Sequence, residues 1–222
     1  MVYSLLLKLF MTHQLKMEEG TISLRDIKMT LLPAFVVTLL TDYFYRKKEL
    51  WKLYFILWFA GFVTIDEIKT IYNMKKPDQV YSFGMNLGEA MGIGIYKTHD
   101  YYPGRYTHFI IPNNPFLEYL PRDIEKMPID YFIAGTMAGG GCLVHNSVCQ
   151  CIELRCKWAG GGTCEFLTGT EKELKSRNLW RIAYKRYNLK KIYPLQKFVF
   201  ENFGKIKLSS LTNKVMENLS PM

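Results

Sequence analysis

Residues 129–166, IDYFIAGTMAGGGCLVHNSVCQCIELRCKWAGGGTCEF, are the stretch around which the rest of the chain is interpreted. The stretch begins with a helix pattern rich in small residues, continues as a strand-like segment and ends on a glycine-rich turn. All five cysteines of the 222-residue chain lie within it, namely Cys142, Cys149, Cys151, Cys156 and Cys164. An even distribution would scatter them, so their clustering indicates a local site.

Within this stretch, Glu153, Cys156 and Cys164 form the pattern E-x2-C-x7-C, with three glycines in the final turn. Thiolates and a carboxylate are suitable Zn²⁺ ligands, and a structural zinc site normally has four of them. In a regular strand Glu153 and Cys156 point to opposite faces, so the strand must end or bulge near Leu154 for them to meet. The competing interpretation is that the cysteines are small buried hydrophobic residues, since no CxxC pair is present.

Outward from this stretch, the hydrophobic periodicity predicts helices that alternate with antiparallel hairpins, which is the α+β class. Small residues at intervals of four, Gly84/Gly88/Gly92 and Ala134/Ala138 with Gly135/Gly139, predict helices whose backbones approach closely. Helices are predicted over 3–16, 34–48, 49–63, 64–74 and 78–96, and another begins at Asp130; the helix over 64–74 could continue the one before it. Strands are predicted as a hairpin around Arg25-Asp26, a hairpin within 95–112, and two strands over 147–158 and 163–167.

The apolar run 50–65 is too short for a membrane span, because it has 16 residues including Lys52 and a bilayer requires about 20. We therefore expect it to be a buried core helix. The odd number of cysteines and the lack of a secretory signal predict reduced thiols and a cytoplasmic location.

The basic residues are concentrated at the end of the chain. Residues 171–222 contain twelve Lys and Arg against four Asp and Glu, which is +8 of the total net charge of +9. We expect a helix over 171–187 with a stripe of Trp180, Ala183, Tyr184 and Tyr187. It would pack on the domain, lie on a membrane surface or contact nucleic acid. The predicted organisation is a domain of residues 1–168 with a basic helical extension of residues 169–222.

The passage IDYFIAGTMAGGG…VCQCIELRCKWAGGGTCEF resembles the vinyl-4-reductase domain family, also described as predicted hydrocarbon-binding domains. The resemblance rests on the Glu/Cys/Cys spacing, Phe166 and the upstream Ala134-Gly135 pair. It implies an antiparallel sheet flanked by helices, as in trafficking-complex subunits and nitric-oxide-sensing domains. It also implies a homodimer and an apolar ligand pocket. In members that sense aromatic compounds, three cysteines and the glutamate hold a structural zinc; here the first cysteine position falls on Asp130.

The sequence therefore predicts a non-enzymatic module that binds or senses an apolar or aromatic small molecule. The pocket would lie between the helices of residues 34–62 and 80–92. Zinc would be held by Glu153, Cys156, Cys164 and Asp130, unless Cys142, Cys149 or Cys151 replaces Asp130 or the metal has been lost. Two alternatives are an enzyme or accessory factor of tetrapyrrole vinyl reduction, and an interaction module that contacts nucleic acid or membrane through residues 171–222. No nucleotide-binding or nucleophile–base signature supports the enzyme.

Overall fold

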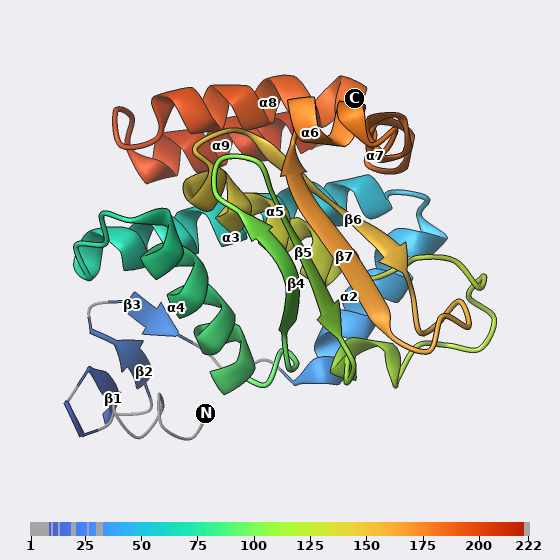
Figure 1. Ribbon diagram of the computed structural model, residues 1–222, viewed down its shortest axis with the longest axis horizontal. Helices are drawn as coiled ribbons and strands as arrows, with labels where there is room; N and C mark the ends of the chain where they lie inside the picture. Colours follow the sequence, from blue (N-terminus) through green and yellow to red (C-terminus); the bar gives the residue numbers. More distant parts are fainter. Residues whose placement is uncertain are drawn as a thin grey trace.

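The computed structural model describes residues 9, 11–12, 14–18, 21–25, 27–29 and 33–219, which form an α+β fold with helices flanking antiparallel sheets (Figure 1). The strands are β1 (Leu15–Glu18), β2 (Thr21–Leu24), β3 (Ile27–Met29), β4 (Lys97–Tyr102), β5 (Tyr106–Ile111), β6 (Cys149–Arg155) and β7 (Cys164–Thr170). The helices are α2 (Ala34–Arg46), α3 (Leu50–Ile71), α4 (Pro77–Ala90), the 3₁₀ turn η1 (Pro115–Leu117), α5 (Tyr131–His145), α6 (Glu171–Ser176), α7 (Trp180–Arg186), α8 (Leu189–Asn202) and α9 (Leu208–Leu219).

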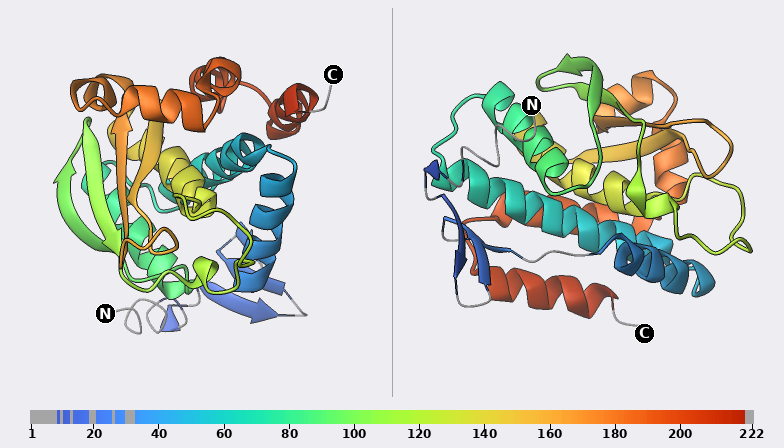
Figure 2. Two further views of the ribbon diagram at one scale, coloured as in Figure 1. Left: turned by 90° about the vertical axis from the view of Figure 1, so that its right-hand side faces the viewer. Right: turned by 90° about the horizontal axis from the view of Figure 1, so that it is seen from below.

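The main sheet has the strand order β4-β5-β7-β6, and every neighbouring pair is antiparallel. The two predicted hairpins, β4–β5 and β6–β7, are confirmed, and the pairing of β5 with β7 joins them into one sheet. Helices cover one side of this sheet, whereas the other side faces outward (Figure 2, left). Phe109 and Ile111 accordingly point into the core, while His108 and Ile110, which alternate with them along β5, are half-buried on the outer side.

Helices α3 and α5 cross at a backbone distance that only small residues allow. A Cβ atom placed on Gly139 would lie 1.9 Å from the Trp58 carbonyl oxygen, and one on Gly61 would lie 2.4 Å from the Thr136 carbonyl oxygen. The predicted close approach of helices is therefore confirmed. Helix α3 is continuous over 22 residues, so the helix expected over 64–74 continues the one expected over 49–63. Within the described part of the chain, no helix combines the length and apolarity that crossing a membrane requires.

Residues 171–219 fold back onto the domain rather than extending from it (Figure 1). The ring of Tyr187 stacks on that of Tyr54 with centroids 3.8 Å apart, and the buried Gln196 side chain accepts a 2.7 Å hydrogen bond from Gln150. The tail helices thus belong to the same hydrophobic core as α3 and α5. The single helix expected over 171–187 is wrong, because α6 and α7 are separated by Asn178 in a left-handed conformation with φ 59°.

Two further expectations need correction. Most of the helix expected over 3–16 lies outside the described residues, but its last two residues, Leu15 and Lys16, belong to strand β1 instead. The hairpin expected around Arg25-Asp26 is confirmed as the pair β2–β3. Helix α4 ends at Ala90, and Gly92 lies beyond it with φ 76°. Because glycine adopts positive φ without steric strain, Gly92 ends the helix instead of contributing to its face.

Candidate functional site

The Glu153, Cys156 and Cys164 side chains come together in the folded chain. One ligand atom from each, a carboxylate oxygen and two Sγ atoms, lies within 4.8 Å of the other two, and all three residues are buried. Two N–H groups, the Asn114 side chain and the Lys157 backbone, approach Cys164 Sγ at 3.5 and 3.4 Å. The hydrogen bond with Cys156 and burial outweigh the donor from Lys157 and raise the pKa of Cys164 above its ordinary value.

A bulge in β6 makes this convergence possible. Glu153 pairs with Phe166 on β7, but the next pair along is Arg155 with Glu165, so Leu154 is the extra residue. The extra residue reverses the alternation of side chains, and Cys156 follows on the same side as Glu153. The bulge predicted near Leu154 from the Glu/Cys spacing is confirmed.

Acidic and thiol groups are concentrated at this cluster, and Arg186, which donates to the Glu153 carbonyl oxygen at 3.0 Å, is the neighbouring cation. A hydrogen bond with Cys164 lowers the pKa of Cys156 to about 5, so this thiol ionises first. Burial, followed by the charges of Asp130 and Cys156, raises the pKa of Glu153 well above its ordinary value. Glu153 Oε1 is buried and lacks a hydrogen-bond partner among the described residues. A buried anionic cluster of this kind is stabilised by a metal cation.

Asp130 lies beside the cluster, and its side chain is engaged elsewhere. Its backbone N–H donates to Glu153 Oε2 at 3.0 Å, its Oδ1 accepts from Ile133 N at 2.9 Å as the N-cap of α5, and its Oδ2 accepts from the Asn114 side chain. Burial raises the pKa of Asp130 to about 7. The structure therefore places Asp130 next to Glu153, Cys156 and Cys164. Its carboxylate is not part of the group of ligand atoms that all lie within 4.8 Å of one another.

The remaining three cysteines are not part of this cluster. Cys142 Sγ accepts a hydrogen bond from Cys149 N at 3.2 Å, and Cys149 Sγ donates to the Gly141 carbonyl oxygen at 3.6 Å. Cys151 is buried in the sheet, and burial raises the pKa of its thiol. Among the described residues, none of the three joins a group of metal-ligating side chains. They behave as buried packing residues.

A cavity of about 290 Å³ lies between the helices and the sheet. The predicted lining by the helix of residues 80–92 is confirmed, and the middle of α3, from Leu57 to Ile65, also contributes. Helix α2, which the sequence led us to include, does not line it. Helix α5 and strands β5 and β7 were missed, although the small residues of α5 leave the space that the cavity occupies. The lining is predominantly apolar and includes Leu57, Ile65, Met85, Phe109, Met137 and Val144.

Few polar groups accompany this apolar lining. Tyr96 lines the cavity, and its hydroxyl is buried without a hydrogen-bond partner in the described part of the chain. Thr107, also in the lining, shares a 3.1 Å hydrogen bond with Nε2 of the buried His145. Burial lowers the pKa of His145 to about 4, so its imidazole is neutral near pH 7.

Comparison with known proteins identifies similar folds. No family model matches the chain, and no curated protein matches it significantly. The phenol-responsive sensory domain of the transcription activator PoxR, solved with phenol, is 16% identical with a TM-score of 0.60, covering 76% of this chain and 92% of that one. A trafficking protein particle complex subunit 3 from Naegleria fowleri, covalently bound to palmitic acid, is 17% identical with a TM-score of 0.47. The match covers 61% of this chain and 91% of that one. At this identity, the likeness to the PoxR domain establishes a shared α+β fold.

Proposed function

We propose that this chain is a non-enzymatic module that binds or senses an apolar or aromatic small molecule in the cavity between α3, α4, α5 and the sheet. The observation that carries the proposal is the cavity itself, with its apolar lining and about 290 Å³ of space. Apolar cavities of about 150 Å³ already accommodate benzene. The space therefore suits a molecule of one or two rings, and the fold shared with a phenol-responsive domain supports this choice.

The hydroxyl of Tyr96 makes the proposal more specific. A buried hydroxyl without a partner destabilises a protein by about 1–3 kcal/mol, and a ligand that carries one hydroxyl or carbonyl would satisfy it. Burial raises the pKa of Tyr96 well above its ordinary value, so the phenol stays protonated and can donate to the ligand. Thr168 Oγ1, also in the lining, is buried without a partner among the described residues too. We therefore propose an aromatic ligand with one or two polar substituents.

Calorimetric titration with phenol and toluene tests this assignment. Both probes should bind, phenol more tightly, and Met85→Trp should abolish both because the indole fills the cavity. Met216→Trp is the matched control, since Met216 is exposed on α9 and does not line the cavity. Tyr96→Phe should weaken phenol binding about tenfold, or about 1.4 kcal/mol, and leave toluene unchanged. If Met85→Trp bound both probes as tightly as the wild-type protein does, the cavity would be refuted as the binding site.

We also propose that Glu153, Cys156 and Cys164 hold a structural zinc ion. The donor set fits, because two buried thiols and a carboxylate with an unpartnered oxygen are the ligand types that zinc prefers. A bound ion would neutralise the buried anions and tie the turn between β6 and β7 to the end of β6. The resemblance to the vinyl-4-reductase family, which stays a prediction, implies the same three ligands and Asp130 as the fourth.

Elemental analysis of protein purified without added metal should find one zinc per chain. Cys164→Ser should lower both the zinc content and the melting temperature, whereas Cys142→Ser removes a buried thiol outside the cluster and should retain the metal. Asp130→Asn keeps an oxygen for the N-cap of α5 but removes the carboxylate, so a fall in zinc content identifies Asp130 as a ligand. Stable, well-folded wild-type protein with little zinc would reject the metal centre.

A homodimer is the third part of the proposal, and an exposed stripe on α2 supports it. Phe35, Leu39 and Tyr43 follow one another at intervals of four residues and are 50%, 61% and 56% exposed. This spacing places them on one helix face. A contiguous apolar face of this kind marks an interaction surface, and a second copy of the same chain is the partner that the family resemblance implies.

A further inference from the structure

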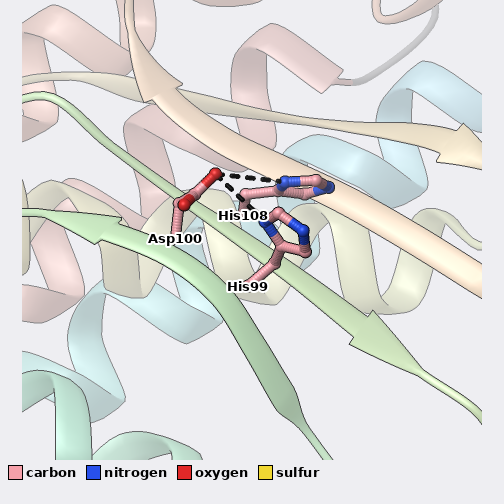
Figure 3. Close-up of side chains that lie close together, drawn as sticks. All are labelled: His99, Asp100 and His108. Carbon is pink, nitrogen blue, oxygen red and sulfur yellow. Dashed lines mark hydrogen bonds and ion pairs between the residues drawn. The ribbon is translucent and has the colours of Figure 1, made fainter.

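A second group of metal-ligating side chains lies on the outward side of the main sheet, away from the buried cysteines. His99 and Asp100 on β4 and His108 on β5 each offer one ligand atom within 4.8 Å of the others. His99 Nδ1 lies 3.1 Å from Asp100 Oδ2, and His108 Nδ1 lies 3.7 Å from the same oxygen. Figure 3 shows the three side chains pointing toward one another from two adjacent strands.

A bulge in β4 brings His99 and Asp100 to the same side of the sheet. Thr98 pairs with Phe109 and Asp100 pairs with His108, which leaves His99 as the extra residue. In a regular strand, neighbouring residues point to opposite faces. Here the bulge directs both toward His108, and bulges that re-aim side chains in this way are frequent beside functional sites.

Glu165 on β7 orients one of the two imidazoles. His108 Nε2 lies 2.7 Å from Glu165 Oε1, and because a carboxylate only accepts, the ring proton is on Nε2. Nδ1 is therefore the atom with a free lone pair, and it faces Asp100. Metal-binding histidines almost always donate their second ring nitrogen to a carboxylate or carbonyl in this manner. Arg155, 3.7 Å from the other oxygen of Glu165, balances the charge of that carboxylate.

We propose that His99, Asp100 and His108 form a binding site for a divalent transition-metal ion, with zinc as its first candidate and Glu165 as a positioning residue. Two ligand atoms of a tetrahedral zinc ion, each about 2.0–2.2 Å from the metal, lie roughly 3.3–3.6 Å apart. The observed separations of 3.1 and 3.7 Å bracket this range for the two pairs that include Asp100, and the two histidine ligand atoms lie within 4.8 Å of each other. Imidazole nitrogens select zinc, copper or nickel over magnesium and calcium. The side chain of His99 is 60% exposed, so the remaining coordination positions are open to water or to a partner's ligand.

This outer site is independent of the buried cysteine cluster. Cys164 and Glu165 are neighbours on β7, and their side chains point to opposite faces of the sheet, one to the thiol cluster and the other to His108. The inner cluster offers sulfur ligands, whereas the outer one offers nitrogen and oxygen. Cobalt(II) distinguishes them, because only thiolate ligation gives an intense sulfur-to-metal charge-transfer band.

The test uses the full chain after chelation, titrated with Zn²⁺ while the imidazole signals of its four histidines are followed by NMR. The ring signals of His99 and His108 should shift together as one equivalent of zinc binds beyond any that the cysteine cluster takes up, and that of His145 should not. His99→Ala and Asp100→Asn should each weaken this binding about tenfold or more, and Glu165→Gln by about tenfold. Asp123→Asn removes another exposed carboxylate and should change nothing. In a parallel titration, His99→Ala should retain any cobalt–thiolate band, so failure of one site is distinguishable from failure of the other.

Zinc that leaves the signals of His99 and His108 unchanged would overturn the proposal. The same conclusion would follow if folded His99→Ala bound zinc at this site with wild-type affinity. Because His99 is exposed, its replacement leaves the core intact, and loss of folding does not obscure the result.

Discussion

Adding one methyl group at Gly139 should separate the two central helices of the domain. A Cβ at this position would lie 1.9 Å from the Trp58 carbonyl oxygen and 2.7 Å from the Phe62 backbone nitrogen. Both atoms belong to the backbone of α3, so no side-chain rotation relieves the contact. To reach an ordinary contact of 3.4 Å, the helices must move apart locally by about 1.5 Å, the difference between 3.4 and 1.9 Å.

Two opposing effects set the size of the change. Alanine favours a helix interior over glycine by about 1 kcal/mol. Overpacking in a well-packed core costs typically 1–3 kcal/mol and more where backbone must move. The crossing also holds the fully buried Trp58 and Tyr54, whose packing a shift would loosen. We expect Gly139→Ala to reduce the free energy of unfolding by about 3 kcal/mol, which lowers the melting temperature by about 6–12 °C for a domain of this size.

Thermal and urea unfolding followed by circular dichroism measure the effect. Gly84→Ala is the matched control, because Gly84 also lies within a helix and its added Cβ would meet only the Cδ1 end of Ile65, at 3.3 Å. There the gain in helix propensity should dominate, raising the melting temperature by a few degrees. If Gly139→Ala were as stable as wild type, the close crossing of α3 and α5 would be refuted.

Three further predictions concern the tail, the dimer and pH. Deleting residues 171–222 removes the buried Tyr187 and Gln196 and several kcal/mol of apolar burial. The product should be insoluble or lack near-ultraviolet circular dichroism, and a well-folded truncated domain would instead support a separable extension. Leu39→Lys should convert a dimer into a monomer in light scattering; wild-type mass near 26.0 kDa would contradict dimerisation. The pKa of His145 falls from 6.5 to about 4 on folding, so the unfolded chain binds the proton more readily. The fold therefore has its full stability with respect to this group above pH 6.5 and loses stability as pH falls toward 4. His145→Gln should remove up to about 3 kcal/mol of that pH dependence of unfolding, and parallel profiles for the two proteins would contradict this.

Local chemistry made part of the site predictable. The spacing of Glu153 and Cys156 requires a bulge at Leu154 if the two are to meet, and the structure contains it. Likewise, Gly135 and Gly139 repeat at an interval that faces one neighbour, and α3 approaches there. In both cases the signal lies within a few residues, where backbone periodicity fixes the direction of each side chain.

Contacts between distant segments were not accessible in the same way. The pairing of β5 with β7 joins residues about 60 positions apart, and it alone brings Glu165 to His108. The expected packing of the tail's aromatic stripe on the domain is confirmed for Ala183 and Tyr187, which are buried. The partner of Tyr187, the ring of Tyr54, depends on where the chain turns at Asn178 and was not predictable. Adjacent His99 and Asp100 were a weak signal of a cluster, because only the bulge places both on one face.

Helix α5 connects the buried thiol cluster with the cavity. At its start, the Asp130 backbone N–H donates to Glu153 Oε2, and Asp130 Oδ1 caps the helix through Ile133 N. Phe132 in the first turn and Thr136 in the second line the cavity, and Gly140 and Gly141 continue its wall. Between these two regions, Gly139 lies directly against the backbone of α3 at Trp58 and Phe62. The hydrogen bond from Asp130 to Glu153 therefore ties the cysteine cluster to the same helix that forms one wall of the cavity.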